Sequence, residues 1–252
     1  MTNDKIFDLE CYKNICKMAD DAELQEISKC YHDKLAEHKY PHNFTWMGVP
    51  ILQEPTDTMM WQELVMQVKP DLIIETGVVR GGSVLLSASL LALLDIENNK
   101  RRRVIGIDID IRQHTHEELH KHDELYYNYI NLIQSSSISP NAIDLVKKMA
   151  GEHEAVIVAL DSDHTHKHVI AELEAYAPLV TPGSYIVVFD TGIEYIGPKQ
   201  IGDRPWGPGN SPMSAVRKFL ITHPEFEQDF DIDKKLIITS APGGWIRRID
   251  TE

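Results

Sequence analysis

The sequence predicts an α/β fold: a doubly wound, mostly parallel seven-stranded sheet with a C-terminal antiparallel hairpin, preceded by an N-terminal helical extension. Between residues 71 and 190, short runs rich in Val, Ile and Leu alternate with segments of helical length. Such runs indicate strands buried on both faces, and the alternation indicates parallel βαβ crossovers. At the end of the chain two apolar runs follow each other with no helical segment between them, which predicts the hairpin.

The N-terminal extension is predicted to be helical. Residues 8–38 contain neither glycine nor proline and have the spacing of an amphipathic helix. Residues 41–56 hold three prolines, so we expect a loop there. We therefore divide the chain into a helical extension with a lid segment, residues 1–56, and a main domain, residues 57–252.

The main domain is expected to begin with a helix at 57–68, with Asp57 or Thr58 as its N-cap. The strands expected after it are 71–76, 103–110, 127–134, 154–161 and 184–190, followed by two more within 226–233 and 235–249. The helices expected between them are 82–95, 115–125, 139–151, 165–180 and 211–224. Between Thr191 and Asn210 lies a long segment rich in glycine and proline, and such a loop in a compact domain is more often functional than idle.

Polar and acidic residues follow each of the first five expected strands. In open α/β sheets, ligands bind outside the carboxyl ends of the strands, so these residues should meet at one edge of the sheet. They are Glu75, Asp108, Asp110, Ser135, Ser136, Ser137, Asp161, Asp163 and Asp190. A ligand site at this edge is therefore expected.

The first βα turn reads E-T-G-V-V-R-G-G-S, from Glu75 to Ser83. Its glycine spacing differs from the G-x-G-x-x-G turn of dinucleotide sites, and a carboxylate at this place repels phosphate. The turn suits S-adenosylmethionine, which carries a sulfonium, an ammonium and two ribose hydroxyls but no phosphate. The residues expected to bind this cofactor are Glu75, Thr76, Gly77, Gly81, Ser83 and Asp108, the last as acceptor from both ribose hydroxyls. The alternative is a plain tight turn flanked by surface carboxylates.

A second acidic cluster predicts a metal site. Asp161, Asp163 and Asp190 lie at neighbouring strand ends, where carboxylates can share a hard cation such as Mg²⁺. The cation would lower the pKa of a substrate hydroxyl, and His164 has a suitable pKa range to take the proton. Asp161 and His164 are therefore the expected catalytic residues. The alternative is that Asp163 caps the following helix and His164 lies in solvent.

The composition limits the compartment and the partners. A formal net charge of −14 argues against a nucleic-acid backbone as the main partner. The three cysteines, residues 11, 16 and 30, suit neither a disulfide framework nor a zinc site and indicate a reducing compartment. The polar N-terminus is not a signal peptide, and no apolar run reaches the ~18 residues of a membrane span. We expect a soluble, cytoplasmic protein without nucleic-acid or membrane partners, whose long N-terminal helix favours a homo-oligomer.

Several motifs occur in the order found in one known family. They are IIETGVVRGGS, VIGIDIDIR, LDSDHTHKHVIAELEAYAPLVTPGSYIVVFDT, RPWGPGNSPMSAV and GGWIRR. Together they resemble the cephalosporin hydroxylase family, which includes rhamnosyl O-methyltransferases, from about Trp46 to Arg248. The resemblance implies a Rossmann-like class I methyltransferase fold, S-adenosylmethionine as cofactor and often Mg²⁺.

The resemblance also implies roles for individual residues. Ser136 and Ser137 would lie near the adenine of the cofactor, and Asp161 would contact both the cofactor and the metal. One motif departs from the family pattern, because Phe189 precedes Asp190 where the family has a glutamate. A metal carboxylate is thereby lost, and Asp163 would have to substitute for it.

These expectations predict an O-methyltransferase that acts on a hydroxyl of a sugar or a secondary metabolite in polysaccharide or antibiotic biosynthesis. Trp206, Trp46 and Phe44 are candidate walls of the acceptor site, or alternatively packing residues. One rival is a nicotinamide-dependent oxidoreductase, against which the glycine spacing argues. The other is a protein that binds the cofactor without turnover, which Phe189 favours.

Overall fold

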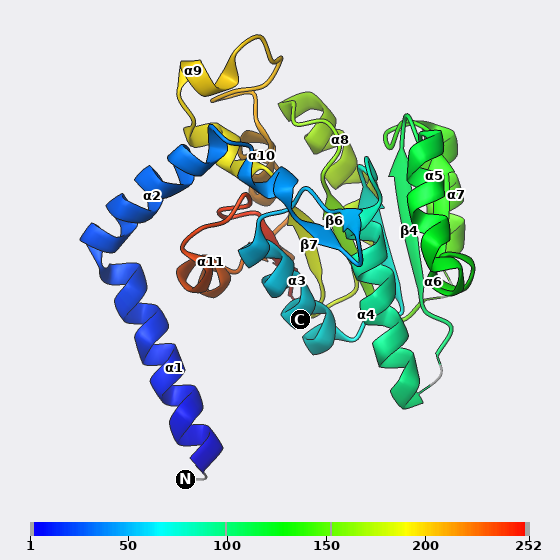
Figure 1. Ribbon diagram of the computed structural model, residues 1–252, viewed down its shortest axis with the longest axis horizontal. Helices are drawn as coiled ribbons and strands as arrows, with labels where there is room; N and C mark the ends of the chain where they lie inside the picture. The colour runs from blue at the N-terminus through cyan, green and yellow to red at the C-terminus, as the bar shows by residue number, and fades with distance from the viewer. Residues whose placement is uncertain (1–2, 99, 152, 250–252) are drawn as a thin grey trace.

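The computed structural model describes residues 3–98, 100–151 and 153–249 of the chain. Its centre is a seven-stranded sheet with the strand order β5–β4–β3–β6–β7–β9–β8 (Figure 1). Neighbours from β5 to β7 are parallel, whereas β9 is antiparallel to both β7 and β8. The strands are β3 (Leu72–Thr76), β4 (Arg103–Asp108), β5 (Ile130–Gln134), β6 (Val156–Leu160), β7 (Tyr185–Val188), β8 (Phe226–Gln228) and β9 (Trp245–Arg248). The predicted fold class is confirmed, including the antiparallel C-terminal pair.

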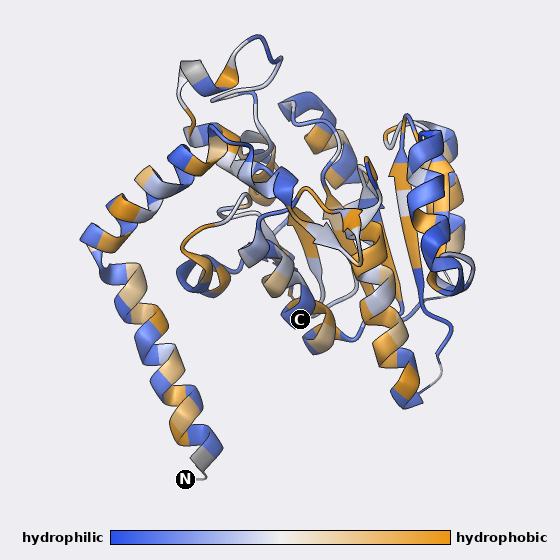
Figure 2. Ribbon diagram, viewed as in Figure 1, coloured by the Kyte–Doolittle hydropathy of each residue, from blue (hydrophilic) through white to orange (hydrophobic). Residues whose placement is uncertain are grey.

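Helices cover both faces of this sheet. One apolar cluster lies between the sheet and α3, α4, α5 and α6, and a second lies between the sheet and α7, α8 and α10. Within β3, Ile73 belongs to the first cluster and Ile74 to the second, because successive side chains of a strand point to opposite faces. These helices are α3 (Pro55–Val68), α4 (Gly82–Asn98), α5 (Gln113–Leu119), α6 (Asp123–Tyr129), α7 (Pro140–Ala150), α8 (His166–Tyr176) and α10 (Pro212–Thr222). Figure 2 shows largely hydrophobic strands enclosed by helices such as α5, whose outer side is hydrophilic.

The N-terminal extension differs from its prediction. In place of one helix over 8–38, the chain forms α1 (Asn3–Asp20) and α2 (Ala22–Ala36). Asp21 interrupts the helix because its backbone is extended and its carboxylate accepts a hydrogen bond from the N–H of Leu24 (3.0 Å). This is the geometry of an N-cap, which aspartate favours over a place inside a helix. Figure 1 shows α1 projecting away from the sheet.

The lid segment packs on the main domain. β1 (Thr45–Trp46) and β2 (Val49–Pro50) form a small antiparallel hairpin, and Val49 and Ile51 are buried in the first apolar cluster. Phe44 and Trp46 pack against the same cluster, with the indole N–H of Trp46 donating to the Ser89 hydroxyl (3.1 Å). The division of the chain at residue 56 remains a prediction.

Several element boundaries of the main domain differ from their predictions. The strand predicted over 127–134 begins only at Ile130, because α6 (Asp123–Tyr129) occupies its first residues, and the helix predicted over 115–125 is divided between α5 and α6. The first helix begins at Pro55 with Glu54 as its N-cap, so Asp57 lies inside it. The carboxylate of Asp57 instead accepts hydrogen bonds from the N–H and the hydroxyl of Ser240, both at 2.8 Å. The helix therefore starts with Pro at its first turn, a position that proline suits because the N–H there has no helical partner.

A short helix, α11 (Phe230–Leu236), joins β8 to β9, where no helix was predicted. Asp229 caps it by accepting a hydrogen bond from the N–H of Asp231 (3.2 Å). The helix has only seven residues, so its sequence is too short to show the periodicity of an amphipathic helix. Within the described ranges, no helix is long and apolar enough to cross a membrane.

Candidate active site

The end of β3 places Glu75 beneath the glycine turn. Glu75 is 3% exposed and accepts a hydrogen bond from the hydroxyl of Ser83 in the first turn of α4. Burial raises the pKa of Glu75 to about 7. The surface-carboxylate alternative is therefore wrong for Glu75, which is a buried acid.

Gly77 and Gly81 give the turn its shape. Gly77 has a φ of +89°, and a Cβ there would lie 1.9 Å from the carbonyl oxygen of Asp161. Only glycine therefore lets the end of β3 pass against the backbone that follows β6. Gly81, with a φ of +87°, lies against the side chain of Leu119. Thr76, directly before Gly77, is fully buried.

Asp108, at the end of β4, holds the same turn from the other side. One carboxylate oxygen accepts hydrogen bonds from the N–H groups of Val78 (2.8 Å) and Val79 (3.0 Å), and the other accepts from Asp110 (2.9 Å). Val79 has a φ of +47°, which is uncommon for a β-branched residue. Its carbonyl also accepts a hydrogen bond from the Thr115 hydroxyl (2.7 Å). Asp108 thus stabilises a strained turn at the edge of the sheet where a ligand is expected.

A small acidic cavity lies between α3, the glycine turn and β6. Its walls include the carboxylates of Asp57, Glu75 and Asp161, the amide of Gln53 and the ring of Phe189. Its volume of about 20 Å³ has room for one water-sized group. One carboxylate oxygen of Asp57, Oδ1, is buried without a hydrogen-bond partner among the described residues.

The electrostatics of this cavity favour a positive ligand. Burial raises the pKa of Asp57 to about 6. Burial first, and then the nearby charge of Asp190, raise the pKa of Asp161 well above its ordinary value. Carboxylates that are crowded and desolvated in this way bind protons or cations to offset their charge.

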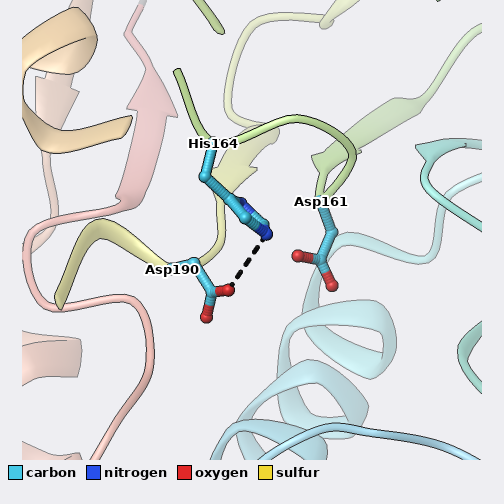
Figure 3. Close-up of side chains that lie close together, drawn as sticks. All are labelled: Asp161, His164 and Asp190. Atoms are coloured by element: carbon cyan, nitrogen blue, oxygen red, sulfur yellow. Dashed lines mark ion pairs between the residues drawn. The ribbon is translucent and has the colours of Figure 1, made fainter. Parts of the chain in front are cut away.

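Asp161, His164 and Asp190 converge next to the cavity (Figure 3). One potential ligand atom from each lies within 4.8 Å of the others. His164 Nε2 is 3.3 Å from Asp190 Oδ2, and Asp161 Oδ2 accepts a hydrogen bond from Gln53 Nε2 at 2.9 Å. Two carboxylates and an imidazole at these distances can hold a divalent cation.

Asp163 lies outside this group of three. Its carboxylate accepts hydrogen bonds from the N–H (2.8 Å) and the hydroxyl (2.6 Å) of Thr165, just before α8 begins. His164 is half-buried and packs edge-on against Trp206, with ring centroids 5.0 Å apart. Trp206 belongs to the segment between β7 and α10, which also contains a 3₁₀ turn (Thr191–Tyr195) and the short helix α9 (Pro198–Ile201).

The serines after β5 differ in their surroundings. Ser137 is buried, and its hydroxyl lies 3.0 Å from His168 Nε2. Its carbonyl accepts a hydrogen bond from the hydroxyl of Tyr176 (2.5 Å). Ser136 is half-buried. Of these two candidates for the adenine site, Ser136 therefore has the more accessible side chain.

Three residues of the site were not predicted in these places. Gln53 was assigned to the lid segment and Asp57 to a helix cap, yet both line the cavity beside Asp161. No local pattern distinguishes them, because only the packing of α3 against the sheet brings them there. Phe189 is buried against Trp61 and Trp245, so it adds an aromatic wall to the cavity.

A family comparison identifies the relatives of this chain. The sequence model of the family described as Rhamnosyl O-methyltransferase/CmcI matches residues 38–249. The chain belongs to this family. The family resemblance inferred from the motifs is thereby confirmed, and the chain is an enzyme of the O-methyltransferase class.

Curated members of the Rhamnosyl O-methyltransferase/CmcI family align over most of the chain. The rhamnosyl O-methyltransferase of Mycobacterium leprae is 31% identical over 232 residues, which cover 86% of this chain and 91% of the relative. The enzyme of the same name from Mycobacterium tuberculosis H37Rv is 29% identical over 230 residues, covering 90% and 86%.

Solved structures confirm the class I methyltransferase fold. A CmcI structure described as Mg-SAM has a TM-score of 0.56 and 19% identity, covering 83% of this chain and 78% of the other. A putative O-methyltransferase from Klebsiella pneumoniae has a TM-score of 0.51 and 15% identity, covering 87% and 90%. At these identities the similarity concerns the fold alone.

Proposed function

We propose that the protein transfers a methyl group from S-adenosylmethionine to a hydroxyl group of a sugar or a secondary metabolite. The observation that carries this proposal is the acidic cavity. Three carboxylates, from Asp57, Glu75 and Asp161, line a space with room for one small group and no basic side chain on its walls. An ammonium group in this space would offset their charge, whereas a phosphate would be repelled.

The residues around the cavity fit this cofactor. Glu75 and Oδ1 of Asp57, which has no hydrogen-bond partner in the described part of the chain, are acceptors for a cationic group, and the Ser83 hydroxyl lies beside them. Asp108 fixes the glycine turn and presents a half-buried carboxylate to accept from the ribose hydroxyls. The names of relatives agree with the proposal, because a related CmcI structure is described as Mg-SAM.

A divalent cation fits the residues that converge at the neighbouring strand ends. Asp161 and Asp190 would hold it, and Asp163 would have to turn away from Thr165 to take part. A bound Mg²⁺ would supply Lewis-acid stabilisation of an acceptor alkoxide. Burial first, and then the charge of Asp190, raise the pKa of Asp161, and a bound cation would offset that cost.

Deprotonation of the acceptor is assigned to His164. Nε2 of His164 lies 3.3 Å from Asp190 Oδ2, and an unprotonated ring nitrogen of His164 would accept the hydroxyl proton. The charge of Asp190 then stabilises the imidazolium, as a carboxylate does beside a catalytic histidine. Trp206 restricts solvent at the same ring, since it packs against His164 edge-on. Methyl transfer is an in-line displacement, so the remaining contribution of the protein is positioning of the two reactants.

The acceptor class is inferred from the relatives. Two curated relatives are named rhamnosyl O-methyltransferases, so a deoxysugar hydroxyl is the first acceptor to test. The experiment combines calorimetric titration with S-adenosylmethionine and NAD⁺ with a radiolabelled methyl-transfer assay on rhamnosides and catechols. We expect binding of S-adenosylmethionine but not of NAD⁺, and label in a glycoside. Binding without label in any acceptor would support the non-catalytic rival, and NAD⁺ binding would support the oxidoreductase.

A further inference from the structure

A chain of polar side chains connects the loop after β6, which lies against Gly77, with the loop after β5. His168 and Glu172 are one turn apart on α8, and Glu172 is fully buried. Glu172 Oε1 accepts a hydrogen bond from the Ser162 hydroxyl at 2.7 Å and lies 3.4 Å from His168 Nε2. The same His168 nitrogen lies 3.0 Å from the hydroxyl of Ser137. We call these four side chains the α8 bridge. None of them is assigned a catalytic role in the reaction proposed above, although Ser137 is a candidate for the adenine site.

The α8 bridge joins two loops that the sheet keeps apart. Ser137 follows β5, whereas Ser162 follows β6, directly after Asp161. In the sheet, β4 and β3 lie between β5 and β6, so backbone pairing does not connect the two loops. Tyr176, also on α8, anchors the first loop again by donating its hydroxyl hydrogen to the carbonyl of Ser137. One helix therefore carries the contacts to both loops.

The α8 bridge contains a buried charged group that does not serve the stability of the fold. Glu172 Oε2 is buried and has no hydrogen-bond partner among the described residues. An unsatisfied buried acceptor destabilises the folded state, and an apolar residue at this position would avoid that loss. A carboxylate here serves instead to hold Ser162 and His168 in fixed directions, as a hydrogen-bonded side chain does in a buried network.

We propose that His168 and Glu172 are positioning residues that couple the loop after β5 to the loop that carries Asp161 and His164. This proposal rests on the proposed function, since it takes the loop after β5 to face the adenine of S-adenosylmethionine. When the cofactor binds, it orders the residues around Ser136. The α8 bridge transmits this order to the loop 161–165. The acid and the base are thereby held in place when the cofactor is bound.

The test compares hydrogen–deuterium exchange with and without S-adenosylhomocysteine as the probe. In the unmodified protein we expect the probe to slow exchange in both segments, 135–139 and 161–165. His168→Leu breaks the α8 bridge, so the probe should protect only 135–139 and should bind about tenfold more weakly by calorimetry. His168→Gln retains an amide that can donate to both partners, and it should restore protection of both segments.

A matched control lies on the same helix. His166 contacts Ser214 on α10 through Nδ1 (2.8 Å) and does not belong to the α8 bridge. His166→Leu is therefore expected to leave the affinity for the probe and the protection of both segments unchanged. If His168→Leu does not fold, as judged by circular dichroism, Ser162→Ala removes only one hydroxyl from the bridge and should give the same loss of protection in 161–165.

Two results separate the failure of this inference from failure of the proposed function. Normal protection of 161–165 in both His168→Leu and Ser162→Ala would overturn the coupling and leave the proposed function intact. A lack of binding of S-adenosylhomocysteine to the unmodified protein would overturn the proposed function, and the coupling would fall with it. Loss of protection in both segments would show general loosening and would also overturn the coupling.

Discussion

At the scale of single residues, the site depends on how closely two backbone segments approach each other. Gly77 lies where the end of β3 passes the carbonyl of Asp161, and the positive φ adds a second reason for glycine. The position of Asp161, and with it the acidic cavity, is therefore fixed partly by a residue with no side chain.

This contact predicts a large effect of one methyl group. Gly77→Ala should destabilise the protein by about 3 kcal/mol or more, because the new Cβ would overlap the Asp161 carbonyl and the backbone would have to move. Gly183→Ala is the matched control, since Gly183 has a φ of +78° but nothing within 4 Å of its Cβ position. It should cost about 1 kcal/mol from the conformation alone. Urea unfolding of both variants measures the difference, and equal losses would contradict the contact.

At the scale of elements, the turn between β3 and α4 is held by a carboxylate from the neighbouring strand. Asp108 accepts from two successive N–H groups of the turn, one of them on the strained Val79. The turn is therefore organised before any ligand binds, which reduces the entropy that a ligand must remove.

Asp108→Asn tests this arrangement. An amide group can present only one oxygen, so one of the turn or Asp110 N–H groups loses its acceptor. We expect the affinity for S-adenosylmethionine to fall at least about tenfold by calorimetry, with little change in the far-ultraviolet circular dichroism. Asp110→Asn is the control, because Asp110 is exposed and its carboxylate bonds only to Arg112 among the described residues. A similar affinity in both variants would show that Asp108 has no special role.

Most elements were predictable from the sequence, and the exceptions share a cause. Buried strands such as β3 and β6 are apolar runs with clear limits, so they can be recognised from the sequence without knowledge of the fold. Asp21 and α11 depend on local capping within polar segments, where several conformations suit the sequence. Propensity alone does not choose between them.

The residues of the candidate site that lie at the carboxyl ends of strands could be predicted from the sequence. Glu75, Asp108, Asp161 and Asp190 were found because parallel strands bring their carboxyl ends to one edge. Asp57 belongs to a helix before the sheet, and only tertiary packing brings it to the cavity. The same reasoning could not locate the α8 bridge, because its serines are far apart in sequence.

At the scale of the whole molecule, the buried acids predict how stability depends on pH. Folding raises the pKa of Glu75 from 4.5 to about 7 and that of Asp57 from 3.8 to about 6. The native state therefore binds more protons than the unfolded state between about pH 4 and pH 7, so stability falls as pH rises through this range. Glu75→Gln should remove part of the slope and stabilise the cofactor-free protein at pH 8 by up to about 3 kcal/mol, since each pKa unit is worth about 1.4 kcal/mol.

Thermal unfolding between pH 4 and pH 8 measures this slope. Glu227→Gln is a suitable control, because Glu227 is exposed and, among the described residues, its carboxylate forms only a long surface ion pair with Arg247 (3.8 Å). That variant should change stability by less than about 0.5 kcal/mol at every pH. An unchanged slope in Glu75→Gln would mean that Glu75 is ionised in the folded protein at neutral pH.

The shape of the molecule also bears on its assembly. α1 exposes Ile6, Phe7, Leu9 and Tyr12, each at least 45% accessible, on a helix that projects from the body. Because exposed apolar patches of this kind often mark association surfaces, we predict a homo-oligomer. Light scattering coupled to size-exclusion chromatography should give more than one chain per particle, and Phe7→Glu should shift it toward one. A monomer at all concentrations would contradict the prediction.

The central claim is that the buried acids at the carboxyl edge of the sheet bind a positively charged nucleoside. Calorimetric titration of S-adenosylmethionine into the unmodified protein and into Glu75→Gln, at pH 8, tests it most directly. The account predicts at least about tenfold weaker binding in the variant, because a desolvated charge-assisted contact is lost. Equal affinity in the two proteins would contradict it.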